Sequence, residues 1–331
     1  MMNTKLKRLR RTAAAFALAL ALAGQALAAT PEYLIPGGNT IGIKLYAKGL
    51  LVTEVSDGSA AQRAGLREGD AILAADGEAL TSVQSLRALV QNGKPLVLTL
   101  ARDGQAAEFL VSPEKSGDVY RLGVSIRDHI AGIGTVTYYD PDTGAFGALG
   151  HGVGGLLDMG LLPVSSGLVV SSSVCGVKRG SSGAPGALRG EFDLTHAVGS
   201  VTANLPQGVF GVMTDVPQRA AVPVAANDDV HIGNATILSN VSGNTVEEFS
   251  VQLERLNPDA ENGRNLLLRV TDERLLALTG GIVQGMSGSP ILQDGRLVGA
   301  VTHVLVSDPT RGYGILIENM LDAVECAESA A

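Results

Sequence analysis

The chain has 331 residues, of which 45% are apolar and 18% are charged, a balance that excludes a disordered protein and allows about two domains. Its net charge of −8 excludes a general nucleic-acid binder, because no basic face follows the N-terminal segment. With 42 glycines and only 4% aromatic residues, the composition favours short strands joined by tight turns over a helical bundle.

Residues 1–28 have the three parts of a secretory signal peptide. A positive head, Lys5 to Arg11, precedes the unbroken apolar run Ala13 to Ala23, and Ala26-Leu27-Ala28 supplies the small residues of a cleavage site. The apolar run is short for a membrane span, which needs about 20 residues. An uncleaved membrane anchor is the alternative. In either case we expect the rest of the chain to work outside the cytoplasm.

The cysteines and histidines indicate which disulfide and metal sites the sequence allows. Cys175 and Cys326 are candidates for a disulfide in an oxidising compartment, although sequence alone does not show whether they pair. The chain has no Cys/His cluster with zinc spacing, so we expect no metal and no cofactor.

Residues 34–112 are predicted to form one compact unit that mixes helices and strands. Turn signals at Asp76-Gly77 and Asp103-Gly104 separate its apolar runs. The expected elements are strands at 41–45 and 49–55, a helix at 59–66, a strand at 69–73, a helix at 83–91 and a hairpin at 96–111.

This order of elements, with the stretch GSAAQRAGLREGDAILAADGEAL, resembles a bacterial PDZ domain of the type attached to exported proteases. In such domains a loop before a strand presents backbone N–H groups to the terminal carboxylate of a peptide, which adds as a strand. The resemblance assigns this role here to Thr40, Ile41, Gly42 and Ile43, with a ligand from another protein or from this chain itself. The alternative is that Gly42 is an ordinary glycine at a strand entry.

Residues 113–119 are polar and rich in turn formers, which predicts a linker. From residue 120 to 331 short apolar runs alternate with Gly, Pro, Asn and Asp, a pattern typical of an all-β barrel or sandwich. A helix is expected at 317–325. The strand-like runs lie at 132–139, 168–177, 209–214, 246–253, 266–270, 281–283 and 297–306.

The strongest chemical signal is Gly-Met-Ser-Gly-Ser-Pro at residues 285–290. A serine hydroxyl becomes a nucleophile when a base takes its proton and N–H groups stabilise the oxyanion. Ser287 is the expected nucleophile, and the flanking glycines allow the N–H groups of Gly285 and Ser287 to face one point. The motif resembles the nucleophile loop of chymotrypsin-like peptidases, except that Ser289 stands where that family usually has glycine. A simple Gly/Ser turn is the alternative.

A serine nucleophile requires a base and a group that orients the base. Among the histidines, His151 lies in a small-residue turn that can present an imidazole, and His303 lies in an apolar strand. The remaining histidines have polar neighbours and are expected at the surface: His129, His196 and His231.

The candidate acid is Asp272, with Asp193 and Asp215 as rivals. The order His151, Asp272, Ser287 matches chymotrypsin-like enzymes, but in those enzymes the acid lies much closer in sequence to the histidine. Asp272 is also well placed to cap a helix that starts at Glu273, so spacing leaves its role open.

Two longer stretches carry a more specific resemblance. VTDERLLALTGGIVQGMSGSPILQDGRLVGAVTHVLVSDPTRGYGILIENML and YRLGVSIRDHIAGIGTVTYYDPDTGAFGALGH are similar to the SpoIVB (stage IV sporulation protein B) peptidases, and the resemblance extends over about residues 34–325. It implies a mainly β protein, with a PDZ domain followed by a chymotrypsin-like double β-barrel. It also implies that His151, Asp272 and Ser287 form the catalytic triad.

The resemblance further implies a role in sporulation signalling. Members of this family are secreted into the space between the two membranes of the developing spore. There they cleave a membrane-anchored regulator, so that an intramembrane protease activates a late sigma factor. The alternatives are an HtrA-like quality-control protease, although such enzymes usually carry PDZ after the protease domain, and a non-catalytic PDZ adaptor.

Overall fold

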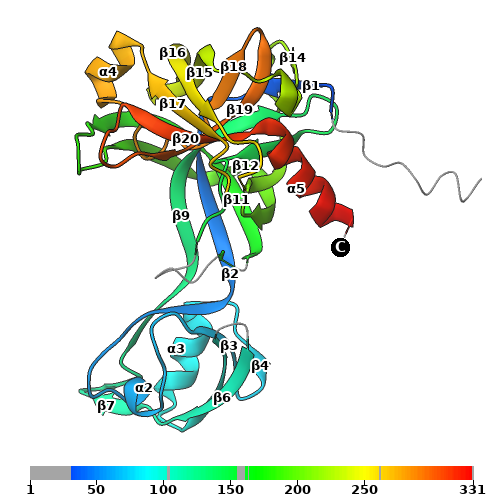
Figure 1. Cartoon of the computed structure of the whole chain (residues 1–331). Helices are drawn as coiled ribbons and strands as arrows, with labels where there is room; N and C mark the ends of the chain where they lie inside the picture. The colour runs from blue at the N-terminus through cyan, green and yellow to red at the C-terminus, as the bar shows by residue number, and fades with distance from the viewer. Residues whose placement is uncertain (1–30, 103–104, 155–160, 163, 261, 330–331) are drawn as a thin grey trace, which may run out of the picture.

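The computed structural model describes residues 31–329 except 103–104, 155–160, 163 and 261. A small unit and a larger β-rich unit are joined by two long neighbouring strands, β2 (Thr40–Val55) and β9 (Val124–Tyr139) (Figure 1). Within the described ranges, no helix is long and apolar enough to cross a membrane. The predicted signal segment at 1–28 lies outside the described residues.

The small unit packs two helices against a curved sheet. Ser59 and Ser82 cap the two helices, each accepting a hydrogen bond from a backbone N–H three residues on. Leu86 and Val90 form the buried stripe of the second helix. The elements are α2 (Ala60–Arg63), β3 (Ala71–Ala75), β4 (Glu78–Ala79), α3 (Val83–Gln91), β5 (Leu96–Arg102), β6 (Gln105–Val111), β7 (Glu114–Ser116) and β8 (Val119–Arg121).

The larger unit contains two barrel-like sheets. The first closes on itself because β9 pairs with both β2 and β10, in the order β9-β10-β13-β12-β11-β2. The second is a closed barrel in the order β15-β16-β17-β20-β19-β18. These sheets and their helices comprise β1 (Tyr33–Pro36), β10 (Ala145–Ala148), β11 (Val164–Lys178), β12 (Ala187–Leu205), β13 (Gly208–Met213), β14 (Val222–Pro223), η1 (Asn227–Asp229), β15 (Gly233–Ser242), β16 (Thr245–Leu256), β17 (Leu266–Val270), α4 (Glu273–Thr279), β18 (Pro290–Gln293), β19 (Arg296–Val304), β20 (Arg311–Leu316) and α5 (Ile317–Ser329).

The small unit is inserted between two strands of the first barrel, which differs from the predicted order of domains. Thr40 to Tyr46 of β2 pair with residues 129–135 of β9, whereas Leu51 to Val55 pair with residues 124–127 inside the small unit. The pairing skips residues at Gly49, whose φ is +96° and where a Cβ would lie 2.6 Å from Ile72 O. The predicted boundary at residue 34 therefore assigned β1 and half of β2 to the wrong unit.

The predicted linker and one predicted strand also differ from the structure. Residues 114–121, most of which the linker was to include, form the hairpin β7–β8, turned at Gly117. The run at 281–283 is not a strand. Gly280 and Gly281 have φ of +77° and +132°, so the chain turns there after α4. Cys175 and Cys326 are both exposed and unpaired.

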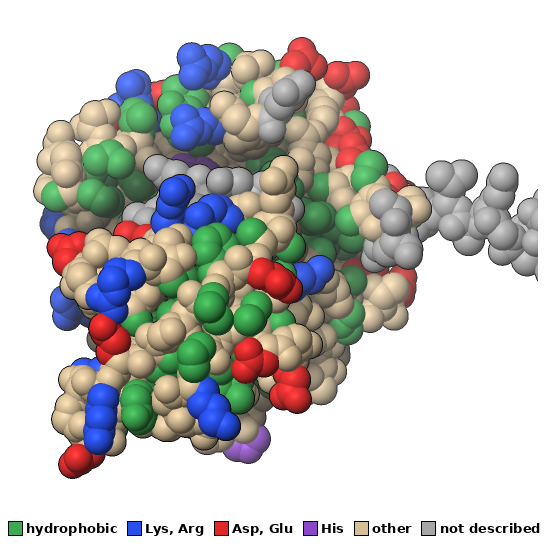
Figure 2. Space-filling view, turned by 90° about the horizontal axis from the view of Figure 1, so that it is seen from below, with side chains coloured by type: hydrophobic (Ala, Val, Ile, Leu, Met, Phe, Trp, Pro, Cys, Tyr) green, Lys and Arg blue, Asp and Glu red, His purple; other side chains and the backbone are tan. Residues whose placement is uncertain are grey.

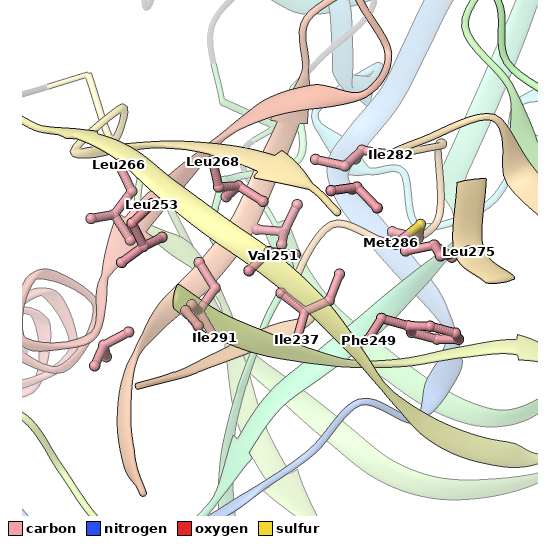
Figure 3. Close-up of a cluster of buried hydrophobic side chains, with 14 of the residues drawn as sticks. Ile237, Phe249, Val251, Leu253, Leu266, Leu268, Leu275, Ile282, Met286 and Ile291 are labelled. Carbon is pink, nitrogen blue, oxygen red and sulfur yellow. The ribbon is translucent and has the colours of Figure 1, made fainter. Parts of the chain in front are cut away.

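The second barrel has a continuous apolar core that anchors the segment carrying Ser287. Ile237, Leu253 and Leu268 are fully buried in it, and Met286 projects into the same core close to Leu275 of α4 (Figure 3). Burying Met286 fixes the residue immediately before the predicted nucleophile.

Candidate active site

His151 lies just after β10, on a turn of unusual backbone. Leu149 and Gly150 both have positive φ, +69° and +67°. Leu149 N–H donates to Thr135 O on β9 at 3.2 Å. The imidazole is half-buried, and its Nδ1 donates to Gly152 O at 3.0 Å. This bond places the proton of neutral His151 on Nδ1, so Nε2 is the nitrogen with a free lone pair.

Asn204 on β12 fixes the chain after His151. Its Oδ1 accepts from Val153 N–H at 2.8 Å, and its Nδ2 donates to Val153 O at 2.9 Å and to Leu162 O at 3.1 Å. Gly152 N–H donates to Pro206 O nearby. Sequence reasoning missed Asn204, because an asparagine before Leu-Pro-Gln-Gly reads as a turn residue and its partner lies 51 positions away.

The loop with Ser287 is held from β9. Thr135 Oγ1 donates to Gly285 O at 2.7 Å, and Thr135 N–H donates to Ser287 O at 3.0 Å. Thr137 Oγ1 donates to Gly288 O at 2.9 Å. Gly285 and Gly288 have φ of +100° and +96°. Two buried threonines therefore fix carbonyls on both sides of the serine, a role that no sequence signal in β9 indicated.

The backbone N–H groups of the loop divide into bonded and free ones. The Met286 N–H donates to Val283 O, the Gly288 N–H to Val301 O and the Ser289 N–H to Met286 O. Those of Gly285 and Ser287 form no hydrogen bond within the described part of the chain. These are the two N–H groups that the sequence analysis predicts as donors to the oxyanion, and both are available to a ligand.

Ser287 and His151 each contact one of two consecutive residues of β19, Thr302 and His303. Ser287 Oγ donates to Thr302 O at 2.6 Å rather than to His151. On the other side the His151 and His303 rings lie 4.7 Å apart, centroid to centroid. A Cβ at Gly150 would lie 2.9 Å from Thr302 Cγ2, so the turn before His151 touches the same residue. Thr302 Oγ1 is buried and has no hydrogen-bond partner.

Burial shifts both imidazoles of this pair toward the neutral form. Burial lowers the pKa of His151, and the Gly152 carbonyl opposes that shift only in part. Partial burial, then the neighbouring His151 ring and Arg264, lower the pKa of His303 to about 4. A neutral His151 with Nε2 unprotonated is the form that can accept a proton.

Asp272 forms no hydrogen bond with His151, which the predicted triad requires. Its Oδ1 accepts from the N–H groups of Arg274 and Leu275, and its Oδ2 from Ser250 N–H and the Arg274 guanidinium. The Arg274 bond, with the backbone donors, lowers the pKa of the carboxyl. Asp272 is thus the N-cap of α4, and His151 Nδ1 is instead bonded to Gly152 O. A helix N-terminus offers free N–H groups that a carboxylate satisfies, which explains this placement.

Within the described ranges neither rival acid forms a hydrogen bond or an ion pair with His151. Asp193 is bonded to Thr195 and His196, which lower its pKa to about 2, and Asp215 is exposed. His129 and His231 face their own carboxylates, Asp128 and Asp294. In the described ranges no group of His, Cys, Asp and Glu is arranged to hold a metal ion.

The four residues predicted to bind a peptide carboxylate in the PDZ domain lie instead in a strand of the first barrel. Thr40, Ile41 and Ile43 are at most 5% exposed, and β2 is paired there with β9 on one edge and with β11 on the other. A Cβ at Gly42 would lie 2.5 Å from the Phe192 ring. This segment is a central barrel strand with no free backbone groups for a peptide, so the prediction was wrong for these residues.

The small unit offers a groove of about 570 Å³ between α3 and the start of β9. Leu86 and Val90 of α3 line one wall, and Val124 and Ile126 of β9 line the other. The segment from Tyr120 to Gly123 also lines the groove. Figure 2 shows the molecule from the side of the small unit, where side chains of both charges surround apolar ones.

The geometry and fold together define a serine peptidase with a PDZ domain. The model of the SpoIVB peptidase S55 family matches residues 118–321, and a PDZ model matches residues 51–102. The chain belongs to the SpoIVB peptidase S55 family. The PDZ match begins where β2 enters the small unit, in agreement with the strand pairing.

Similarity to curated proteins is confined to a short segment. The chain is 35% identical over 94 residues to a probable periplasmic serine endoprotease DegP-like of Chlamydia trachomatis and 34% identical over 94 residues to that of Chlamydia muridarum. These segments cover 26% of this chain and 18% of each relative.

Two solved structures are distantly similar to this chain. An inactive-form mutant of Rv3671c from M. tuberculosis has a TM-score of 0.36 at 13% identity, over 60% of this chain and 82% of that one. The HtrA-type protease AlgW with a decapeptide has a TM-score of 0.36 at 12% identity, over 65% and 55% of the two chains.

The histidine pKa values predict the pH dependence of catalysis. If neutral His151 is the base, the acid limb of kcat/KM should be centred below the ordinary histidine pKa of 6.5, because burial lowers the pKa of this imidazole. Stability should change in the same direction. The unfolded chain binds more protons than the native one below pH 6.5, so stability present above that pH is lost as the pH falls. A pH–rate profile with a fluorogenic peptide measures the first effect. A limb centred above 6.5 would contradict this assignment.

Proposed function

We propose that this chain is an exported serine endopeptidase in which Ser287 is the nucleophile and His151 the general base. The observation that carries the proposal is that Ser287 contacts Thr302 and His151 contacts His303, the next residue of β19. Thr135 holds the loop of Ser287. Residues from β9, β10, the nucleophile loop and β19 contribute to one place, which is the arrangement that acyl transfer requires.

In the first step Ser287 Oγ leaves Thr302 O and donates to His151 Nε2. The imidazole takes the proton as Oγ attacks a peptide carbonyl, and the N–H groups of Gly285 and Ser287 receive the oxyanion. His151 then protonates the leaving amine, and a water activated by the same Nε2 hydrolyses the acyl-enzyme. One such N–H donor typically contributes about 2.7–4 kcal/mol to transition-state stabilisation.

Gly152 O takes the orienting role that the sequence gave to Asp272. A carbonyl accepts the Nδ1 proton and fixes the tautomer, but it supplies less stabilisation to an imidazolium than a carboxylate does. Asp272 contributes indirectly, because it begins the helix that packs Leu275 against Met286 beside the nucleophile (Figure 3).

The groove between α3 and β9 is the proposed peptide-binding site of the PDZ domain. The N–H groups of Leu122 and Gly123 form no hydrogen bond within the described ranges, while their carbonyls accept from Ala61 and Ser56. Free N–H groups on the lining of a groove with apolar walls suit a terminal carboxylate. The ligand is a protein chain end, of a partner or of a second copy of this protein.

The cellular role that we propose is sporulation signalling, in the intermembrane space of a developing spore. Family membership supports it, as does the expected signal segment. The substrate would be a membrane-anchored regulator, whose cleavage lets an intramembrane protease activate a late sigma factor.

Complementation in the native host tests this role. A strain lacking the gene should accumulate the unprocessed sigma factor precursor, wild type should restore processing, and Ser287→Ala should not. If the deletion strain processes the precursor normally but degrades misfolded exported proteins poorly, the HtrA-like alternative holds. If Ser287→Ala restores processing, the chain acts as a non-catalytic adaptor.

A further inference from the structure

Four neighbouring strands of the second barrel place one residue each in a row on its outer face. Arg255 of β16 is directly opposite Leu267 of β17, which is in turn opposite Tyr313 of β20. Tyr313 is also opposite His303 of β19. Opposed residues of antiparallel strands point to the same face of a sheet. All four are exposed or half-buried, whereas Leu268, next along β17, is fully buried in the core, so this row faces outward.

The row begins beside the proposed catalytic base. The exposed His303 ring lies 4.7 Å from the His151 ring, centroid to centroid, and Thr302, the residue before His303, accepts the hydrogen bond of Ser287 Oγ. Neighbouring strands lie about 4.8 Å apart, so the row runs about 14 Å from His303 to Arg255. A peptide that Ser287 attacks can therefore lay the residues on one side of its scissile bond along this row.

Two arginines give the row a positive charge. The Arg264 guanidinium, just before β17, lies 5.0 Å from the centroid of the Tyr313 ring, which is a cation–π contact. Arg264 and Arg255 are both exposed, and within the described ranges neither side chain forms a hydrogen bond or an ion pair. After burial and the His151 ring, Arg264 is the third cause that lowers the pKa of His303. The charge of Arg264 therefore reaches the end of the row beside the base.

The neighbouring arginines of the same barrel face are neutralised by carboxylates. Arg269 and Arg311 both pair with Glu254, at 2.5 and 3.0 Å, and Asp308 lies 3.9 Å from Arg311. Two positive and two negative charges are therefore grouped together there. The row that leads to His303 has guanidinium groups without such partners, and their planar donors match a carboxylate from a ligand.

We propose that this row selects substrates with acidic residues on one side of the scissile bond, whose carboxylates bind Arg264 and Arg255. This inference rests on the proposed function of Ser287 and His151. Tyr313 holds the Arg264 guanidinium through the ring contact and offers an apolar surface between the two charges. The net charge of the chain is −8, so a local positive row also orients an acidic peptide that the rest of the surface repels.

The test compares peptides that differ in one charge. The full chain is assayed with a fluorescence-quenched decapeptide library in which each position in turn is glutamate, glutamine or lysine, and mass spectrometry locates the cleaved bond. We expect kcat/KM to be about fivefold higher for glutamate than for glutamine at positions on one side of that bond. The preference should shrink as the salt concentration rises, because both arginines are exposed.

Charge changes in the row locate this preference. Arg264→Gln and Arg255→Gln should each bring the glutamate-to-glutamine ratio close to one at a single position, and Arg264→Lys should retain most of it. Arg264→Glu should favour lysine instead. The ratio compares two peptides on the same protein, so a loss of folded enzyme does not move it. Arg67→Gln is the matched control, because Arg67 is an exposed arginine of the small unit, and it should keep the wild-type ratio.

The outcomes separate this inference from the proposed function. If wild type shows no glutamate preference, or if the preference survives in both glutamine variants, the row does not recognise the substrate and the inference is overturned. If a fluorophosphonate labels Ser287 but no peptide of the library is cleaved, the stated substrate class is wrong while the nucleophile stands. If Ser287 is never labelled, the proposed nucleophile itself is wrong.

Discussion

Replacing Gly288 with alanine is expected to lower kcat by about 10²–10³-fold, comparable to the loss of an oxyanion donor. Gly288 has a φ of +96°, and a Cβ there would collide with Thr135 O and lie 2.5 Å from Leu149 N. Both neighbours are backbone atoms and cannot rotate away. The loop must therefore shift, and the N–H groups of Gly285 and Ser287 shift with it.

Gly295→Ala is the matched control for this prediction. Gly295 also has a positive φ, +75°, in a turn of the same barrel, but a Cβ there meets nothing within 4 Å. It carries the backbone strain without the collision. Both variants are assayed with a fluorogenic peptide and by thermal unfolding. Activity of Gly288→Ala within about threefold of the control would contradict the proposed geometry of the loop.

Asp272→Asn and His151→Gln should have very different effects on catalysis. Asparagine caps a helix as well as aspartate does, so Asp272→Asn should keep α4 intact and reduce kcat by less than about tenfold. His151→Gln removes the base and should reduce kcat by about 10⁴-fold or more. The comparison decides whether the carboxylate or the Gly152 carbonyl orients the imidazole.

Asp272→Ala supplies the control for the cap. It leaves the first N–H groups of α4 without their acceptor and should cost about 1 kcal/mol of unfolding free energy, measured by denaturant titration. The result that would refute the cap assignment is a loss of about 10⁴-fold in kcat for Asp272→Asn at unchanged stability, which is the behaviour of a triad acid.

Local elements of this chain were predictable because local patterns determine them. The apolar stripe of α3 gave its bounds, 83–91, and the run at 266–270 is β17. The family resemblance and the fold class were confirmed by the family match and the two barrel-like sheets. The Gly-x-Ser-Gly motif identified a loop that the structure places at a convergence of distant strands.

Pairing between distant strands was not predictable from the sequence. A period-two pattern shows that residues 41–45 form a strand but not whether the partner is a PDZ strand or β11, and this ambiguity displaced both the domain boundary and the predicted carboxylate loop. Thr135 and Asn204 were missed for the same reason, because their roles depend on contacts across 150 and 51 positions. The sequence allowed Asp272 to be either the triad acid or a helix cap, and the structure shows that it caps α4.

The most direct test of the catalytic assignment is to locate the adduct of a fluorophosphonate by peptide mass spectrometry in wild type, Ser287→Ala and Ser289→Ala. Ser289 is fully buried and bonded to Ser239, so it should not react, and its replacement should leave labelling in place. We predict a single adduct on Ser287 in wild type and Ser289→Ala, and none in Ser287→Ala. An adduct that persists in Ser287→Ala, or maps to another serine, would contradict the account.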